Sequence, residues 1–194
     1  CAAQYPRLRA EWASLLQSLP RVISVSHPVT GLPEQFSLSR DSLLRSVRAP
    51  LYSPALAAAL PAAIHAAAQG RFEGLMGLSG ALGSSKAMRL AAGMHFSVVC
   101  AEDVPRLASA TDKPGADFGN SDAQLYQQTC KTWPRGDVPA AFYSVPPAPS
   151  PVLVLSGGAD PVTPPRHGER VAKLLGSRAQ HIVVPEAGHG VMGV

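Results

Sequence analysis

Residues 151–194 hold the pattern that most constrains how this chain can fold. A run of valine and leucine at residues 152–155 ends in Ser-Gly-Gly, and a second apolar run at residues 181–184 leads to Gly-His-Gly. Between them, residues 164–176 begin with two prolines, carry apolar side chains at helical spacing and end at a glycine. Two short apolar runs around one amphipathic helix predict the strand–helix–strand unit of a parallel sheet.

Two side chains with catalytic potential follow the predicted strands. Asp160 and His189 each lie on a loop flanked by glycines, just past the carboxyl end of a strand. An aspartate that accepts from one ring nitrogen of a histidine leaves the other nitrogen to act as a base toward a serine. Acid before histidine is also the chain order of the α/β-hydrolase triad. The alternative is an aspartate in a turn and a histidine in a glycine-rich loop, neither of them catalytic.

The nucleophile that such a pair would serve is missing. It is expected on a Gly-x-Ser-x-Gly turn after a strand, and no such string occurs in the sequence. The nearest string, at residues 77–81, places Ser79 in Gly-Leu-Ser-Gly-Ala, but residues 74–76 before it contain no β-branched side chain and suit a strand poorly. We therefore expect Ser79 to be a packing residue and the chain alone to be inactive.

The remainder of the chain is expected to be mostly helical. Apolar spacing, capping residues and proline positions predict helices at residues 7–19, 39–47, 54–69, 72–90 and 122–129. Alternating apolar residues predict a two-stranded hairpin near residues 23–25 and 36–38, and an extended segment at residues 94–99. Pro61 is expected to kink or split its helix. A proline-rich linker then separates a helical region, residues 1–145, from the closing unit, residues 146–194.

Composition and charge exclude several classes of function. Hydrophobic residues make up 46% of the chain, which is enough for a core and too much for disorder. The formal charge of +4 comes from scattered basic residues without the patch that nucleic acid requires, and no apolar run reaches the roughly 20 residues of a membrane helix. Asp160, His167, His181 and His189 match no metal-ligand spacing, so we expect no metal and no cofactor.

The three cysteines leave two interpretations open. None of Cys1, Cys100 and Cys130 lies in a Cys-x-x-Cys pair, which argues against a zinc site. One interpretation pairs Cys100 with Cys130 and leaves Cys1 to a partner outside the sequence. The other is three reduced cysteines in a cytosolic protein.

Several strings resemble one family. PVLVLSGGADPVTPP followed by VVPEAGHG resembles the C-terminal part of the α/β-hydrolase superfamily, and is most similar to its secreted tripeptidyl aminopeptidase and proline iminopeptidase-like branch. SVVCAEDVPR and CKTWP are similar to patterns of that branch's cap, and CAAQYPRLRAEW to the start of the cap. The resemblance is specific at residues 93–107 and 150–190 and weak at residues 22–90.

The resemblance implies the fold and the roles of several residues. It implies an α/β fold, the C-terminal portion of an α/β-hydrolase with a mostly helical cap, or lid, insertion. Asp160 matches the family acid and His189 the family base, and Cys100 and Cys130 match a cap disulfide. A disulfide and the resemblance imply a periplasmic or secreted bacterial protein. The family's nucleophile elbow and the strands before it are absent, so the expected partner is the N-terminal half of the same hydrolase.

The resemblance also implies a substrate class. In an aminopeptidase of this kind, a cap carboxylate pairs with the free amino group of the peptide through a charge-assisted hydrogen bond. Glu102 and its neighbour Asp103 are the candidates, although a surface or capping acid is the plainer interpretation. The expected function is that of an exopeptidase fragment acting through an acyl-enzyme. The alternatives are an esterase or lipase-like hydrolase acting on small esters, and a non-catalytic binding module that keeps the cap scaffold.

Overall fold

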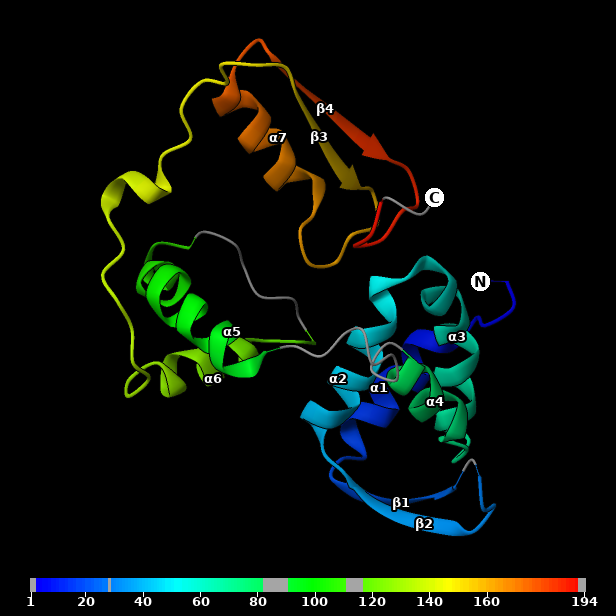
Figure 1. Ribbon diagram of the computed structural model, residues 1–194. Helices are drawn as coiled ribbons and strands as arrows, with labels where there is room; N and C mark the ends of the chain where they lie inside the picture. The colour runs from blue at the N-terminus through cyan, green and yellow to red at the C-terminus, as the bar shows by residue number, and fades with distance from the viewer. Residues whose placement is uncertain (1–2, 28, 82–90, 111–116, 192–194) are drawn as a thin grey trace. The chain divides into compact units, whose positions relative to one another are not determined.

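The computed structural model describes residues 3–27, 29–81, 91–110 and 117–191 of the 194-residue chain. The chain divides into two compact units: unit 1 comprises Cys1–Ser85 and Val145–Val194, and unit 2 comprises Lys86–Ser144. Helices and small two-stranded sheets occur together in the chain, as an α/β fold requires (Figure 1). Cys1 lies outside the described residues, as do residues 82–90 of the predicted helix 72–90.

Unit 1 begins with a helix and a hairpin. Helix α1 (Leu8–Gln17) precedes β1 (Arg21–Ser26), which pairs in antiparallel fashion with β2 (Pro33–Leu38). Both the helix and the hairpin were predicted, because apolar residues recur at helical spacing in the first and alternate in the second. The turn between the strands passes through Gly31 at φ 69, a conformation that glycine adopts without steric cost.

Three helices and a 3-10 turn pack on the hairpin and α1 (Figure 1). They are α2 (Arg40–Arg48), η1 (Ala49–Tyr52), α3 (Pro54–Ala68) and α4 (Glu73–Ala81). Ser39 caps α2 in a capping box with Ser42. Helix α3 continues through Pro61 as one element, so the proline does not split it. The side chains of Leu43, Phe72 and Leu75 are at most 1% exposed and form the centre of this core.

The C-terminal part of unit 1 is the strand–helix–strand unit that the sequence predicts. Strand β3 (Val152–Gly157) pairs in parallel with β4 (Ala179–Val184), and α7 (Pro165–Leu175) connects them (Figure 1). Helix α7 ends at Gly176, whose φ of 84 disfavours any residue with a side chain. The parallel register brings the carboxyl ends of β3 and β4 to one edge of the sheet.

Unit 2 is helical and carries a disulfide. Its elements are α5 (Ala92–Val98), the π-helical turn η3 (Val99–Asp103), the 3-10 turn η4 (Val104–Ser109), α6 (Ser121–Thr129) and the 3-10 turn η5 (Ala140–Tyr143). Cys100 and Cys130 form a disulfide that ties η3 to the end of α6. Among the residues that the structure describes, no helix is long and apolar enough to cross a membrane.

The extended segment predicted at residues 94–99 is wrong, because these residues lie in α5 and at the start of η3. Phe96, Val99 and Cys100 are spaced by three and four residues, which puts them on one helix face. The Phe96 ring contacts Tyr126 and Trp133, at centroid distances of 5.9 and 5.2 Å. A short apolar run does not distinguish a strand from a buried helix by periodicity alone, and here the packing against α6 decides for the helix.

Candidate active site

The loop after β3 places Asp160 beside the loop after β4. Gly157 and Gly158 end the strand, and the backbone N–H of Gly158 donates to the carbonyl of Val184 at 2.8 Å. A Cβ on Gly157 would overlap the carbonyl oxygen of Gly188, so the two loops touch through backbone alone. Glycine at position 157 is therefore what allows the close approach of the two loops.

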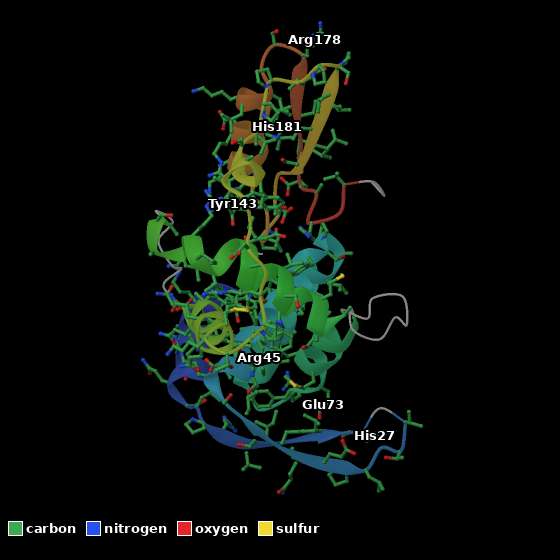
Figure 2. The ribbon with its side chains drawn as sticks, turned by 60° about the vertical axis from the view of Figure 1, so that its left-hand side comes forward. His27, Arg45, Glu73, Tyr143, Arg178 and His181 are labelled. Atoms are coloured by element: carbon green, nitrogen blue, oxygen red, sulfur yellow. A yellow bond between two sulfur atoms is a disulfide. The ribbon has the colours of Figure 1, made fainter. Side chains whose placement is uncertain are left out.

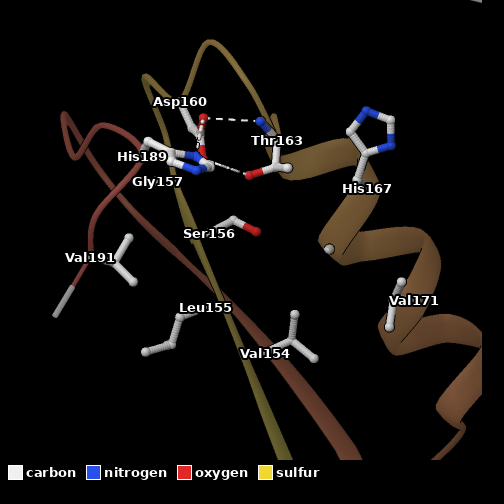
Figure 3. A pocket seen from close by; sticks show the side chains of 11 residues that line it. Val154, Leu155, Ser156, Gly157, Asp160, Thr163, His167, Val171, His189 and Val191 are labelled. Atoms are coloured by element: carbon white, nitrogen blue, oxygen red, sulfur yellow. Dashed lines mark hydrogen bonds and ion pairs between the residues drawn. The ribbon is translucent and has the colours of Figure 1, made fainter. Parts of the chain in front are cut away.

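Asp160 is held by donors from its own loop. Its Oδ1 accepts the backbone N–H groups of Val162 at 2.8 Å and Thr163 at 3.0 Å, and its Oδ2 accepts the Thr163 hydroxyl at 2.8 Å (Figure 3). The residue is only 8% exposed. A carboxylate with this many donors keeps a fixed orientation, and the remaining face is open to His189.

His189 faces the Asp160 carboxylate with its Nδ1 atom. Nδ1 lies 3.2 Å from Oδ1 and 3.1 Å from Oδ2 of Asp160 (Figure 3). The turn before it passes through Glu186 at φ 59, an uncommon conformation for a residue with a side chain. The His189 side chain is 41% exposed, so the acid is covered while the base remains accessible. The structure thus brings together the two residues that the sequence analysis placed as acid and base.

The environment of Asp160 favours its charged form. Burial is the largest single influence and by itself raises the pKa of the carboxyl. The hydrogen bonds from Thr163, Val162 and His189 together outweigh burial and lower the pKa from 3.8 to about 2. Asp160 is therefore an anion at neutral pH, and an anion favours the Nδ1-protonated tautomer of His189.

A pocket of about 270 Å³ extends from this pair along β3 and α7. Ser156 lines it and donates to or accepts from His181 Nε2 at 2.9 Å, while His167 lies farther along α7, apart from the Asp160–His189 pair (Figure 3). Ser156 is 8% exposed, and a Cβ on Gly168 would come within 2.5 Å of its Oγ. This serine–histidine pair is packed under the helix. Within the described residues, no set of three His, Cys, Asp or Glu side chains is arranged to hold a metal ion.

The pairing of Ser156 with His181 was not predicted from the sequence. The signal that could have found it is strand alternation, because residues 152, 154 and 156 share a face with residues 179, 181 and 183 in the observed register. The role of Thr163 was not predicted either, although its position three residues after Asp160 suits an Asx-type turn.

The other candidates lie away from this pair in the chain. Glu102 is half-buried in η3 and its backbone carbonyl accepts the Tyr143 hydroxyl at 2.9 Å, whereas Asp103 is exposed. Both belong to unit 2, and Asp160 and His189 to unit 1. Ser79 lies inside α4, with no strand before it, so the local turn of a nucleophile elbow is absent there.

Comparison with known proteins shows a similarity in the C-terminal part of the chain. Residues 116–193, less than half of the chain, match the family model described as TAP-like protein. This part of the chain is therefore similar to TAP-like α/β-hydrolases. The matched segment contains β3, α7 and β4 with both Asp160 and His189, and it begins before Cys130. Neither a search of curated proteins nor a search of solved structures gave a match to the chain.

Proposed function

We propose that the chain is the C-terminal portion of a serine hydrolase in which Asp160 and His189 are the acid and the base. The observation that carries this proposal is the contact of His189 Nδ1 with both oxygens of a buried, anionic carboxylate, at 3.1 and 3.2 Å. The match of residues 116–193 to a hydrolase family supports the same assignment. Residues 146–194 then form the closing unit of the core, and residues 1–145 the mostly helical cap.

The proposed chemistry is acyl transfer through the free ring nitrogen. With Nδ1–H donating to Asp160, Nε2 of His189 takes the proton of a serine hydroxyl as that oxygen attacks the substrate carbonyl. His189 then gives the proton to the leaving group, and an acyl-enzyme remains. Water, deprotonated by the same nitrogen, releases the acid and restores the serine. Asp160 stays ionised throughout and stabilises the imidazolium.

The proposal assigns the nucleophile and the oxyanion hole to a segment outside this sequence. Ser79 sits within α4 and lacks the strand-to-helix turn of a nucleophile elbow, and Ser156 is 8% exposed and packed under α7, so neither is placed as a nucleophile requires. The segment that carries the nucleophile is also the proposed partner of the sheet formed by β3 and β4. On the sheet face opposite α7, three apolar side chains are partly exposed: Leu153 at 58%, Leu155 at 36% and Ile182 at 40%. Because parallel sheets are covered on both faces, we propose that this segment covers the exposed one.

The proposed substrate is a peptide with a free amino group. A carboxylate at the mouth of the site favours removal of residues from the amino end, because it forms a charge-assisted hydrogen bond with the α-ammonium group. Glu102 is the first candidate and Asp103 the second. The disulfide between Cys100 and Cys130 supports export to the periplasm or the medium, where disulfides persist.

The first experiment tests the catalytic pair in the protein that contains both this chain and the nucleophile. We expect His189→Ala and Asp160→Asn each to lower kcat on the order of 10⁴-fold, with His181→Ala as the control that keeps activity. The 194-residue chain alone should show no labelling by a fluorophosphonate probe. Labelling of Ser79 or Ser156 in it, or near-normal activity of His189→Ala, contradicts the proposal.

The second experiment separates a peptidase from an esterase. Peptide substrates with free and with acetylated amino ends are compared with a small ester, in wild-type protein, Glu102→Gln and Glu169→Gln, the last an exposed carboxylate of α7 used as a control. A peptidase of the proposed kind prefers the free amino end, and Glu102→Gln reduces that preference. Preference for the ester favours the alternative hydrolase, and no turnover of any substrate favours a binding module.

A third experiment tests export through the thiols. Titration of the unreduced protein should leave both Cys100 and Cys130 unreactive, whereas three reactive thiols would overturn the assignment to an oxidising compartment.

A further inference from the structure

A groove of about 840 Å³ lies between the β1–β2 hairpin and α4 in unit 1, formed by residues with no part in the proposed chemistry. Its lining comes from the end of β1, from β2 and from one side of α4 (Figure 2 shows His27 and Glu73 at this side of the hairpin). The volume falls in the range of small-molecule sites.

The groove exists because α4 covers only half of the inner hairpin face. The antiparallel register pairs Ile23 with Phe36 and Val25 with Glu34, so all four side chains share one face. Ile23 and Val25 are 3% and 8% exposed, but Phe36 is 47% exposed. The face is therefore closed over β1 and open over β2, where an aromatic ring forms an apolar floor.

The side of the groove formed by α4 carries few large side chains. Gly77 and Gly80 of α4 line it, and a Cβ on either would meet no atom within 4 Å. Met76, which is half-buried, lines it as well and offers a flexible apolar surface that adapts to different shapes. The space beside α4 is thus filled by no neighbouring side chain of the described residues.

The polar groups of the groove favour a cation. Glu34 and Glu73 line it, and no lysine or arginine is among the described residues that do so. Glu73 is tied to the hairpin by accepting the Ser26 backbone N–H at 3.4 Å. His27 accepts the N–H groups of Val29 and Thr30 at Nδ1, so this nitrogen is occupied within its own turn. Two carboxylates above an apolar floor therefore set the charge of the site.

We propose that this groove binds a small amphipathic cation, an apolar chain or ring that carries a protonated amine. The apolar part covers Phe36 and Met76, and the ammonium group lies against Glu34 and Glu73, where the Phe36 ring adds a favourable cation–π contribution. The proposal is independent of Asp160 and His189, so it stands or falls separately from the hydrolase assignment.

The test is a titration of the 194-residue chain followed by amide chemical shifts. n-Hexylamine is the probe, with n-hexanol and hexanoate as matched ligands that keep the chain and change the head group. We expect saturable shifts at β2 and α4, with hexylamine tightest and hexanoate weakest. Equal affinity for the amine and the carboxylate, or no saturable shift in these elements with hexylamine, overturns the proposal.

Two pairs of variants test charge and shape. Glu34→Gln combined with Glu73→Gln should weaken hexylamine by about fivefold or more and leave hexanol unchanged, whereas Glu169→Gln should change neither. Gly80→Leu should abolish binding of all three ligands by filling the groove. Gly93→Leu, at an exposed glycine of α5 with no atom within 4 Å of a Cβ, should not. Unchanged hexylamine affinity in Gly80→Leu, with native amide shifts elsewhere, contradicts the proposed site.

Discussion

The backbone carbonyl of Tyr52 accepts the backbone N–H of His189 at 3.2 Å, and the two rings meet edge to face with centroids 5.3 Å apart. Tyr52 ends η1 in the first half of the chain, and the histidine follows β4 near its end. The same carbonyl would lie 2.5 Å from a Cβ on Gly188. The loop of His189 therefore lies against η1, and glycine at position 188 allows this close approach.

Removing the Tyr52 ring should loosen His189. We expect Tyr52→Ala to lower the free energy of unfolding by about 0.5–1.5 kcal/mol and to increase the motion of the His189 imidazole, while Tyr52→Phe keeps both. Denaturant unfolding measures the first quantity, and relaxation of the ring carbons the second. If the Ala and Phe variants behave alike, the ring contact does not position His189.

Gly157 should tolerate no side chain. Gly157→Ala pushes a methyl group into the carbonyl of Gly188 and to 2.6 Å from that of Ala187, so the two loops must separate. We expect a loss of about 1–3 kcal/mol in the free energy of unfolding. Gly136→Ala is the control, because a Cβ there meets nothing within 4 Å. Equal stability of the two variants would show that the loops are not in contact.

The Thr163 hydroxyl should help to keep Asp160 ionised. Thr163→Val removes the donor to Oδ2, so the pKa of Asp160 should rise from about 2 toward 3.8, while Thr163→Ser leaves it near 2. The two backbone donors remain, which limits the rise. Carbon-13 titration of the carboxyl group measures the pKa, and an unchanged value in Thr163→Val would exclude the hydroxyl as a cause.

The lowered pKa of Asp160 also predicts how stability depends on pH. A carboxyl whose folded pKa lies below its unfolded value stabilises the fold above the unfolded pKa, and this contribution is lost as pH falls from about 3.8 through about 2. The full contribution is about 2 kcal/mol. Asp160→Asn should therefore remove part of the acid-induced loss of stability that we expect of the wild type between about pH 5 and pH 2. If the free energy of unfolding depends on pH in the same way in wild type and Asp160→Asn, the pKa of Asp160 is not lowered in the folded protein.

Gly168 and Ser156 should be energetically coupled. Gly168→Ala brings a methyl group to 2.5 Å from Ser156 Oγ and 2.7 Å from His181 Nε2, and Ser156→Ala removes one of these atoms. We expect each single variant to be destabilised, by about 1 kcal/mol or more, and the double variant to be more stable than the sum of the two losses predicts. If the stability losses of the two single variants simply add, α7 shifts away from Ser156 and His181 instead of clashing with them.

The strand–helix–strand unit at the end of the chain shows which elements short-range sequence patterns can predict. Two apolar runs, an amphipathic segment and its terminal glycine were enough to predict strands β3 and β4 and helix α7. The positions of Asp160 and His189 could also be predicted, because functional side chains in parallel sheets lie on the loops after the carboxyl ends of the strands. The hairpin and the cap of α2 also depend only on residues that are close together in the sequence. Residues 94–99 were misassigned because their contacts, the rings of Tyr126 and Trp133, come from a segment about thirty residues away in sequence.

By itself, the sequence determined the order of elements and the two residues with acid and base chemistry, because caps, periodicity and glycine positions act over a few residues. Only the tertiary structure decided that both Asp160 oxygens face Nδ1 of His189, that Tyr52 supports that histidine and that the hairpin leaves Phe36 open. The first two are contacts between residues far apart in the chain, and the third is the exposure of a side chain that α4 does not cover. Tertiary packing decides which distant side chains meet, and short-range sequence patterns do not predict it.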